Sequence, residues 1–395
     1  MGRPDGARHA TLSLLRHLTP LQIGIDLVCL LPAGETVDRA AAEKELDLLS
    51  CSTISRSPSL FWRLPSLSTP FTFRTFSAPK VRMAFKERMA ALLKTMAPSQ
   101  KVFMVFDGLH PFAVLSQPDL EALSRQCQGI VYRAHNVETT LWEQCAEKSR
   151  TPWFRLFFRH QAGLVRSFER NVSKHVSLIA PVSEDDAEKF RNLAPKTRVH
   201  VTPIGMDFPA EETLEPIPES GKFELLFIGR LDWIPNRSGL IWFLENIWPR
   251  LVISRPHMSL KIAGIGDSRW IRRFKNQCGI EFLGPVDEVQ PLYDSCALSI
   301  APLFQGSGTR VKIIESARYG RPVVTTALGA EGSGLVPGTS YFRAENQNEW
   351  LSQLGTLVRE DCQRVGVTAY RSLRDRFDGK RVAEQFAHTL AGSGT

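Results

Sequence analysis

The chain alternates short apolar runs, rich in β-branched and aromatic residues, with longer amphipathic segments. This alternation is typical of parallel α/β architecture, and the near-continuous apolar character of the runs predicts sheets covered by helices on both faces. The first series of runs lies at 25–32, 101–108, 129–136, 175–183 and 199–205. The second series lies at 222–231, 259–266, 279–286, 298–306 and 321–326. We therefore expect two doubly wound α/β domains.

The length of the chain and one break in composition place the domain boundary. At about 100–200 residues per domain, 395 residues predict two domains. Residues 206–221 (MDFPAEETLEPIPESG) are rich in Pro and Glu and have no periodicity, which predicts a linker. It would join a first domain at 1–205 to a second at 222–375, followed by a C-terminal helix and tail at 376–395. The ligand crevice is expected at the carboxyl ends of the strands.

Two segments of the first domain do not fit the alternation. Residues 4–18 predict a glycine-containing loop that opens a helix, an arrangement that normally follows a strand, yet no apolar run precedes them. The domain is therefore expected to lack its first strand: either the chain begins one strand late, or another segment fills that position. Residues 48–80, rich in Ser, Pro and aromatic residues, predict an irregular loop with one or two short pieces of structure.

Composition excludes several classes of protein. With 43% hydrophobic and 23% charged residues, the chain is neither disordered nor collagen-like nor a disulfide scaffold. No apolar stretch approaches the ~18–20 residues of a membrane helix, and the start has no apolar core of a signal peptide. The seven scattered cysteines predict reduced thiols, so the sequence favours a cytoplasmic location.

The excess of positive over negative charge is confined to the first half of the chain. Residues 1–205 hold 27 Lys and Arg against 19 Asp and Glu, an excess equal to the whole net charge of +8. The excess concentrates in 74–101 and in 150–174, where the bases are interleaved with Trp153, Phe154, Phe157 and Phe158. Such a helix can lie on an anionic membrane or meet an anionic substrate, or it can be a solvated helix with aromatics in the core. Nucleic acid is not expected as a partner, because no recognised binding motif accompanies the charge.

The strongest group of candidate residues is GSGTRVKIIESARYGRPVVTT (306–326). A glycine-rich turn at the start of a helix lets backbone approach a ligand and presents free amides to an anion. Arg310 and Lys312 could add positive charge, although two residues apart on one helix they would not point at the same spot. Glu315 could accept hydrogen bonds from sugar hydroxyls. The simpler interpretation is a plain strand-to-helix turn with surface charges.

Two further elements complete the candidate site. In FIGRLDWIPN (227–236), Arg230 follows a buried strand, and a planar guanidinium suits the paired oxygens of a diphosphate. The alternative is a salt bridge from Arg230 to Asp232 or to a neighbouring loop. The chain at GIEFLGPV (279–286) could pass a flat base, although by itself it is only a strand.

Together these motifs resemble the second domain of GT-B-fold glycosyltransferases of family 4. In the first half, YRAHNVETTLW (132–142), ERNVSKHVSLIAPVSEDD (169–186) and VTPIGMD (201–207) are similar to the same family. The resemblance covers nearly the whole chain, most strongly 129–345 and least 33–100. It implies two Rossmann-like domains facing a central cleft, an acceptor-side first domain, and a C-terminal helix that returns to it.

The resemblance also implies roles for individual residues. Arg230 would hold the donor diphosphate, and His135 would lie across the cleft near the reacting sugar carbon. Glu315 would bind the donor ribose, and the backbone around Leu283 would meet the base. The remaining residues of the donor site would be Gly229, Asn236, Gly306, Ser307, Gly308, Thr309, Arg310 and Lys312.

Three departures from the family pattern bear on these roles. The family's first Glu, eight residues before its second, falls on Ser307, or on Gln305 if the loop is longer. The family's lysine, five residues after the diphosphate arginine, falls on Pro235, for which Lys312 or Arg310 could substitute. The third departure is at the start: family members have a strand before the glycine loop, and this sequence shows none there.

The resulting prediction is a retaining glycosyltransferase that uses a nucleotide-diphospho-sugar without a metal or a separate cofactor. Its acceptor would be a surface glycan or a lipid-linked sugar, met on the inner face of the membrane. The absence of a DxD at a strand end argues against a metal-dependent site, and there is no P-loop, HExxH or GxSxG. Two alternatives stay open: a degenerate GT-B protein that only binds or regulates, and a nucleotide-sugar epimerase of the same fold.

Overall fold

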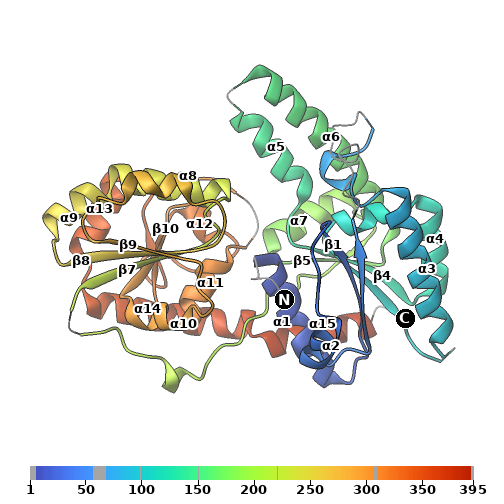
Figure 1. The fold of residues 1–395 in the computed structure, drawn as a ribbon. Helices are drawn as coiled ribbons and strands as arrows, with labels where there is room; N and C mark the ends of the chain where they lie inside the picture. Colours follow the sequence, from blue (N-terminus) through green and yellow to red (C-terminus); the bar gives the residue numbers. More distant parts are fainter. Residues whose placement is uncertain are drawn as a thin grey trace. The chain divides into compact units, whose positions relative to one another are not determined.

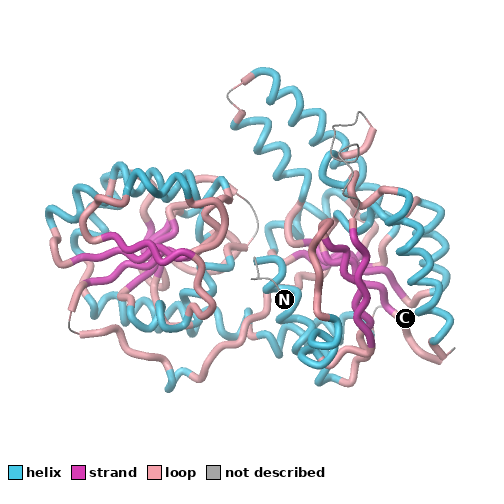
Figure 2. Tube along the Cα trace, viewed as in Figure 1, coloured by secondary structure: helices cyan, strands magenta, loops and turns pink. Residues whose placement is uncertain are grey.

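The computed structural model describes residues 6–56, 68–97, 99–149, 151–219, 221–306 and 309–392. The chain forms two compact units (Figures 1 and 2): unit 1 is Met1–Pro203 with Val382–Thr395, and unit 2 is Ile204–Arg381. Every strand pair among the described residues is parallel. The predicted fold class, two α/β units with parallel sheets, is confirmed.

Unit 1 is built from short strands that alternate with helices. Its described strands are β1 (Asp26–Leu31), β2 (Ser50–Ser55), β3 (Phe103–Asp107), β4 (Gly129–Ala134), β5 (Leu178–Pro181) and β6 (Arg198–Val199). Its described helices are α1 (Gly6–Leu18), α2 (Arg39–Leu46), α3 (Pro79–Thr95), α4 (Gln117–Gln126), α5 (Glu138–Lys148), α6 (Pro152–His175), α7 (Glu184–Leu193) and α15 (Gly379–Ala391). Short 3-10 helices lie at Thr19–Leu21, Phe71–Phe73 and His110–Val114.

The strands of unit 1 form two separate sheets. One has the order β3-β4-β5-β6, and the other contains β1 and β2 alone. Both β1 and β3 feed side chains into the same hydrophobic layer, because Val28 and Leu30 pack against the cluster that contains Phe106 and Ile130. Although they share this layer, β1 and β3 do not pair with each other. Among the described residues β1 pairs only with β2, and β3 only with β4, so each of the two strands has one open edge. Val105, in the middle of β3, is accordingly 40% exposed.

The C-terminal helix belongs to unit 1, as the resemblance implies. Leu14 and Leu18 of α1 and Phe386 and Leu390 of α15 pack against Val131 of β4 in one cluster. The opposite face of the same sheet is covered by α3, α4, α6 and α7, which pack on the alternate side chains of the strands. The alternation of period two along the strands thus produces a sheet buried on both faces.

The described parts of 48–80 contain short pieces of structure, as expected, and residues 57–67 of this segment lie outside the described residues. The predicted irregular loop at 48–80 contains β2, a regular six-residue strand parallel to β1. Its sequence, SCSTIS, is polar and small, and only Cys51 and Ile54 are buried. That composition carries no strand signal, so the partner strand β1 decides its structure.

Unit 2 contains one six-stranded sheet. Its strands are β7 (Phe223–Ile228), β8 (Met258–Ala263), β9 (Ile280–Gly284), β10 (Leu298–Ala301), β11 (Val323–Thr325) and β12 (Phe342–Arg343), in the spatial order β12-β11-β10-β7-β8-β9. Its helices are α8 (Ile234–Asn246), α9 (Trp248–Ser254), α10 (Gln290–Ser295), α11 (Val311–Arg318), α12 (Ala327–Ala330), α13 (Gln347–Thr356) and α14 (Arg359–Phe377), with 3-10 helices at Glu211–Thr213 and Arg269–Phe274.

Helices cover both faces of this sheet (Figure 1): α8, α9 and α13 lie on one side, and α10 and α14 on the other. On β7, Leu225 and Phe227 pack on the α8 side, whereas Leu226 and Ile228 pack on the α10 side. Strand β7 is therefore buried on both faces in the middle of the sheet.

The predicted linker at 206–221 is packed against unit 2. Ile217 is buried in the core of that unit, and the guanidinium of Arg321 donates to the carbonyls of Glu215 (2.8 Å) and Pro216 (3.3 Å). The hydroxyl of Tyr370 donates to the carbonyl of Pro209. The structural boundary accordingly falls between Pro203 and Ile204. The Pro and Glu content of 206–221 predicts a linker, but the buried guanidinium of Arg321 holds the carbonyls of Glu215 and Pro216.

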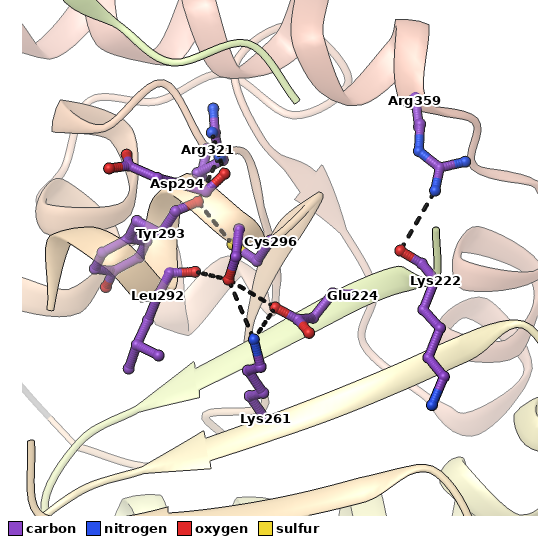
Figure 3. A network of polar contacts seen from close by, with 10 residues as sticks. Lys222, Glu224, Lys261, Leu292, Tyr293, Asp294, Cys296, Arg321 and Arg359 are labelled. Atoms are coloured by element: carbon purple, nitrogen blue, oxygen red, sulfur yellow. Dashed lines mark hydrogen bonds and ion pairs between the residues drawn. The ribbon is translucent and has the colours of Figure 1, made fainter. Parts of the chain in front are cut away.

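Arg321 belongs to a polar network on the α10 side of the sheet (Figure 3). Arg321 also donates to the carbonyls of Tyr293 (2.7 Å) and Asp294 (3.1 Å). Nearby, the carboxylate of Glu224 accepts from Ser295 Oγ and from Lys261 Nζ, both at 2.8 Å. Because these groups are paired with one another, the network fixes α10 against β7 and β8.

No helix among the described residues is both long enough and apolar enough to cross a bilayer.

Candidate active site

The topology of unit 2 favours the carboxyl ends of β7 and β10 as the candidate ligand site. From β7 the chain continues to β8 and β9 on one side, and then returns to β10, β11 and β12 on the other. Parallel α/β sheets bind ligands at this point, because the loops after the two central strands diverge there. Gly229 and Arg230 follow β7, and the glycine turn at 306–309 follows β10.

Lys312 lies at the centre of this site. Its Nζ is 2.5 Å from Oδ1 of Asn236, on α8, and 4.5 Å from the ring centroid of Phe227, on β7. Burial, and secondarily the positive charge of Arg310, lower the pKa of Lys312 to about 7. Asn236 is itself buried and donates from Nδ2 to the carbonyl of Arg230 at 2.9 Å. Two parts of the chain that are distant in sequence, 227–236 and Lys312, therefore meet at one cation.

Gly229 is required by this arrangement. A Cβ at this position would lie 2.7 Å from Nδ2 of Asn236 and 2.9 Å from Nζ of Lys312. These separations are shorter than any van der Waals contact, so a larger residue would push the amide and the ammonium away from the end of β7. The glycine lets both polar groups approach the backbone.

Arg310 precedes the helix rather than lying on it. The helix α11 begins at Val311, and Arg310 has extended backbone angles (φ −85°, ψ 95°). The expectation that Arg310 and Lys312 diverge on one helix is therefore wrong, and the charge of Arg310 reaches Lys312. Arg310 is only 5% exposed, and its Nη2 would lie 3.4 Å from a Cβ on Gly306, whose φ is +121°. Glycine tolerates this left-handed conformation.

The other residues of the glycine turn are described in part. Gly306 and Thr309 are described, whereas Ser307 and Gly308 lie outside the described residues. Gln305, the alternative for the family's first Glu, donates from its side-chain amide to Ser238 Oγ at 2.9 Å.

Arg230 is half-exposed and pairs with Asp232. Its Nε and Nη2 donate to the two carboxylate oxygens of Asp232 at 3.1 and 2.8 Å. The salt bridge that the sequence left open as an alternative is thus present. An anion that binds Arg230 must compete with Asp232 for the same face of the guanidinium.

Glu315 lies on α11, about one turn after Lys312. Its Oε2 accepts a hydrogen bond from the hydroxyl of buried Tyr293 at 3.1 Å. Burial raises the pKa of Glu315, although Arg318 and the Tyr293 hydroxyl oppose the shift. Leu283, predicted beside the base, is half-buried on β9, two strands away from β7.

A second polar cluster lies in unit 1, at the carboxyl ends of β3 and β4. Asp107 Oδ1 is 2.8 Å from Nε2 of His135 and 2.9 Å from Nη1 of Arg133, which is only 1% exposed. The other oxygen of Asp107 accepts from the hydroxyl of Thr11, on α1. Burial acts to raise the pKa of Asp107, but the charges of Arg133 and His135 outweigh it and hold that pKa well below its usual range. An ionised carboxylate only accepts, so Nε2 of His135 carries a proton.

The helix after His135 is held by a buried carboxylate. Glu169, on α6, accepts hydrogen bonds from the backbone amides of Glu138 (3.0 Å) and Thr139 (3.1 Å), at the start of α5. It also accepts from the hydroxyls of Thr139 (2.7 Å) and Tyr132 (3.2 Å). Burial and the nearby Glu169 raise the pKa of Glu138 to about 8. A carboxylate at a helix N-terminus satisfies free amides, so Glu169 fixes the loop that carries His135.

The structure brings some of the predicted residues together and adds others. Gly229, Asn236 and Lys312 make direct contact, and Arg310 lies beside Lys312. Asp107 was not predicted, although its place directly after the apolar run KVFMVF is a signal for a strand-end site residue. Among the described residues, no group of three or more His, Cys, Asp or Glu is placed to hold a metal ion.

Comparison with known proteins bears on the fold and on the class of the second unit. Residues 222–360 match the family model described as glycosyl transferases group 1. An uncharacterised 44.6 kDa protein in the cps region of Klebsiella pneumoniae is 20% identical over 295 residues, which cover 71% of this chain and 72% of that protein.

The fold matches solved structures along nearly its whole length. Anabaena HepE, solved in complex with UDP and glucose, superposes with a TM-score of 0.66 at 15% identity, covering 99% of this chain and 97% of HepE. Sucrose-phosphate synthase from Thermosynechococcus elongatus superposes with a TM-score of 0.68 at 14% identity, covering 96% and 91%. A glycosyltransferase from Rickettsia africae gives 0.66 at 12% identity, covering 99% and 96%. Residues 222–360 thus match the group 1 glycosyl transferase model, and the chain as a whole has the fold of these solved structures.

Proposed function

We propose that the chain is a retaining glycosyltransferase that takes a sugar from a UDP-sugar and transfers it to a glycan or a lipid-linked acceptor. The observation that carries the proposal is the buried cation of Lys312 at the end of β7, with Arg310 beside it. A buried ammonium and guanidinium at a topological switch point suit the diphosphate of a nucleotide-sugar. The choice of UDP rests on HepE, which was solved with UDP-glucose.

In this proposal the cationic side chains stabilise the departing diphosphate. The bond between the anomeric carbon and the phosphate oxygen breaks while the acceptor oxygen bonds to the same face of that carbon. The proton of the acceptor hydroxyl passes to the leaving phosphate oxygen, so no enzyme nucleophile and no metal ion takes part. Lys312 and Arg310 would balance the charge that develops on the diphosphate, together with the backbone amides at the start of α11.

Lys312 also explains one departure from the family pattern. The family's lysine position is occupied by Pro235, and Lys312 Nζ contacts Asn236, the next residue along the chain. We propose that Lys312 supplies the missing positive charge and that Asn236 orients it. Arg230 would contact the diphosphate after releasing Asp232, and Glu315 would hold the ribose.

Unit 1 is assigned to the acceptor in this proposal. His135, held by Asp107, would act near the reacting sugar carbon. A role in surface polysaccharide synthesis, at the inner face of the membrane, is supported by the Klebsiella relative from the cps region.

Proton NMR of the purified chain with UDP-glucose, UDP-galactose and UDP-N-acetylglucosamine tests the reaction directly. We expect slow hydrolysis of one donor in which the α-anomer of the sugar appears first, at a rate that EDTA leaves unchanged. Lys312→Met should lower this rate by about 10²–10³-fold, as the loss of a buried charge-stabilising donor does. The exposed Lys275→Met serves as the matched control.

Other outcomes would contradict parts of the proposal. First appearance of the β-anomer would refute retention, and loss of the rate in EDTA would refute metal independence. Conversion of one UDP-sugar into another would identify an epimerase. Near-normal turnover in Arg230→Ala would remove Arg230 from the diphosphate site.

A further inference from the structure

The helices α5 and α6 form a hairpin that projects from the body of unit 1 (Figure 1). Its two helices are held together by the ion pair between Arg166 and Glu143 and by the rings of Trp142 and Phe158, whose centroids are 6.0 Å apart. At the base of the hairpin Glu169 is fully buried under the start of α5. The hairpin is thus a rigid arm, anchored at its base.

The tip of this arm, defined here as Trp153–Leu156, is apolar and unburied. Trp153 is 82% exposed, Phe154 61% and Leu156 63%. Two turns further along the same helix Gln161, Ala162 and Val165 are buried in unit 1. Large apolar side chains gathered at one end of a protruding element mark an interaction surface.

Exposed arginines accompany the apolar side chains of the tip. Arg155 lies within the tip and Arg159 one turn further along α6, whereas Arg170 and Lys174 lie near the base of the hairpin. Of the described acids of the hairpin, Glu143 is paired with Arg166, and Glu169 is buried at the base. Glu147, near the end of α5, is exposed. Trp and Phe flanked by arginines match the interfacial region of an anionic bilayer, where aromatic rings enter the headgroup layer and bases meet lipid phosphates.

The other basic segment predicted from the sequence, 74–101, does not offer such a surface. Arg74 is buried, and Lys86 pairs with Asp119 at 2.7 Å. Arg82 donates to the carbonyl of Val114 at 3.3 Å, and Arg88 donates to Ser50 Oγ at 3.1 Å. Much of the charge on α3 therefore serves contacts within unit 1, which leaves the hairpin as the candidate surface.

We propose that the α5–α6 hairpin is a membrane anchor whose tip inserts Trp153, Phe154 and Leu156 into the interface of an anionic bilayer. This inference rests on the proposed function, because the acceptor side belongs to unit 1, and anchoring unit 1 would deliver it to lipid-linked acceptors. The competing hypothesis is that a second copy of the chain covers the tip, and the experiment below distinguishes it from membrane insertion.

Co-sedimentation of the full chain with lipid vesicles tests the anchor. The probes are vesicles of phosphatidylcholine alone and vesicles with about 30% phosphatidylglycerol, an anionic lipid. We expect about tenfold tighter binding to the anionic vesicles, weakening as salt is added. The triple variant Trp153→Ser, Phe154→Ser, Leu156→Ser should lose at least about tenfold in vesicle affinity, since insertion of these side chains drives binding.

The control is Ile253→Ser, which removes an equally exposed apolar side chain (80%) from α9 of unit 2 and should leave vesicle binding unchanged. Equal binding to both kinds of vesicle, or unchanged binding by the triple variant, would overturn the proposal. Loss of a dimer by the triple variant in light scattering, without loss of vesicle binding, would assign the tip to a second copy.

UDP binding by the same proteins separates this proposal from the proposed function. Retained UDP binding with lost vesicle binding in the triple variant supports the anchor. Vesicle binding without UDP binding in the wild type refutes the proposed donor site while leaving the membrane contact intact.

Discussion

Replacing Asp107 by Asn should destabilise unit 1 and separate the ionic role of this side chain from its size. The carboxylate lies 2.9 Å from the guanidinium of Arg133 and 2.8 Å from Nε2 of His135. Arg133 is 1% exposed, so the neutral amide would leave a buried guanidinium without its counter-charge. Breaking a buried ion pair costs about 3–5 kcal/mol. We expect the lower end, about 3 kcal/mol, because the side chain of Asp107 is itself 27% exposed.

The pH dependence of this loss follows from the direction of the pKa shift. The pKa of Asp107 is depressed in the folded protein, so its stabilising contribution is present above the unfolded pKa of about 3.9 and disappears as the pH falls below it. Urea unfolding of wild type and Asp107→Asn should therefore differ most at neutral pH and converge on acidification.

Glu45→Gln supplies the control for this experiment. Glu45 forms an exposed pair with Arg16 at 2.7 Å, with both side chains about half exposed. Surface pairs contribute less than about 1 kcal/mol, so this variant should remain close to wild type. The reasoning about Asp107 would be refuted if Asp107→Asn cost no more than Glu45→Gln at pH 7, or if its deficit persisted in acid.

Three further predictions concern other parts of the molecule. Because burial lowers the pKa of Lys312 to about 7, UDP affinity measured by calorimetry should fall as the pH rises above about 7, approaching tenfold per pH unit; a flat profile to pH 9 would contradict this. Glu169→Ala should cost about 2–3 kcal/mol in chemical denaturation by exposing the amides at the start of α5 to a void, whereas Glu169→Gln, which keeps an acceptor, should cost less; equal losses would remove the capping role. The amides of Val28, Leu30 and Val105 point to the open edges of β1 and β3, so hydrogen exchange should be faster there than in β4, and equal protection would show that these edges are covered.

The fold could be predicted largely from apolar periodicity. The run at 129–136 contains β4 (Gly129–Ala134), and the run at 222–231 contains β7 (Phe223–Ile228), because buried parallel strands need continuous apolar side chains. The polar strand β2 could not be found in this way, since its partner β1 determines it. The anchoring of 206–221 was missed for a related reason: the buried guanidinium that holds it belongs to Arg321, more than 100 residues away.

The candidate site could likewise be predicted only in part: its residues could be chosen from the sequence, but the contacts between them could not. The glycine turn, Arg230 and Lys312 could be chosen because each follows a predicted strand or begins a predicted helix. Which of them meet could not be predicted, because the contact between Lys312 and Asn236 joins residues 76 apart in the chain. The role of Asp107 likewise depends on Arg133 and His135 from the neighbouring strand and loop.

The most direct test of the central claim is a thermal-shift panel of the full chain with UDP, GDP, ADP and TDP. A ligand at about 100 times its Kd adds about 2.7 kcal/mol to the free energy of unfolding. We predict that UDP alone stabilises the protein, and that Lys312→Met abolishes the shift while Lys275→Met retains it. Stabilisation by none of the four nucleotides, or an equal shift by UDP in Lys312→Met, would contradict a donor site built around Lys312.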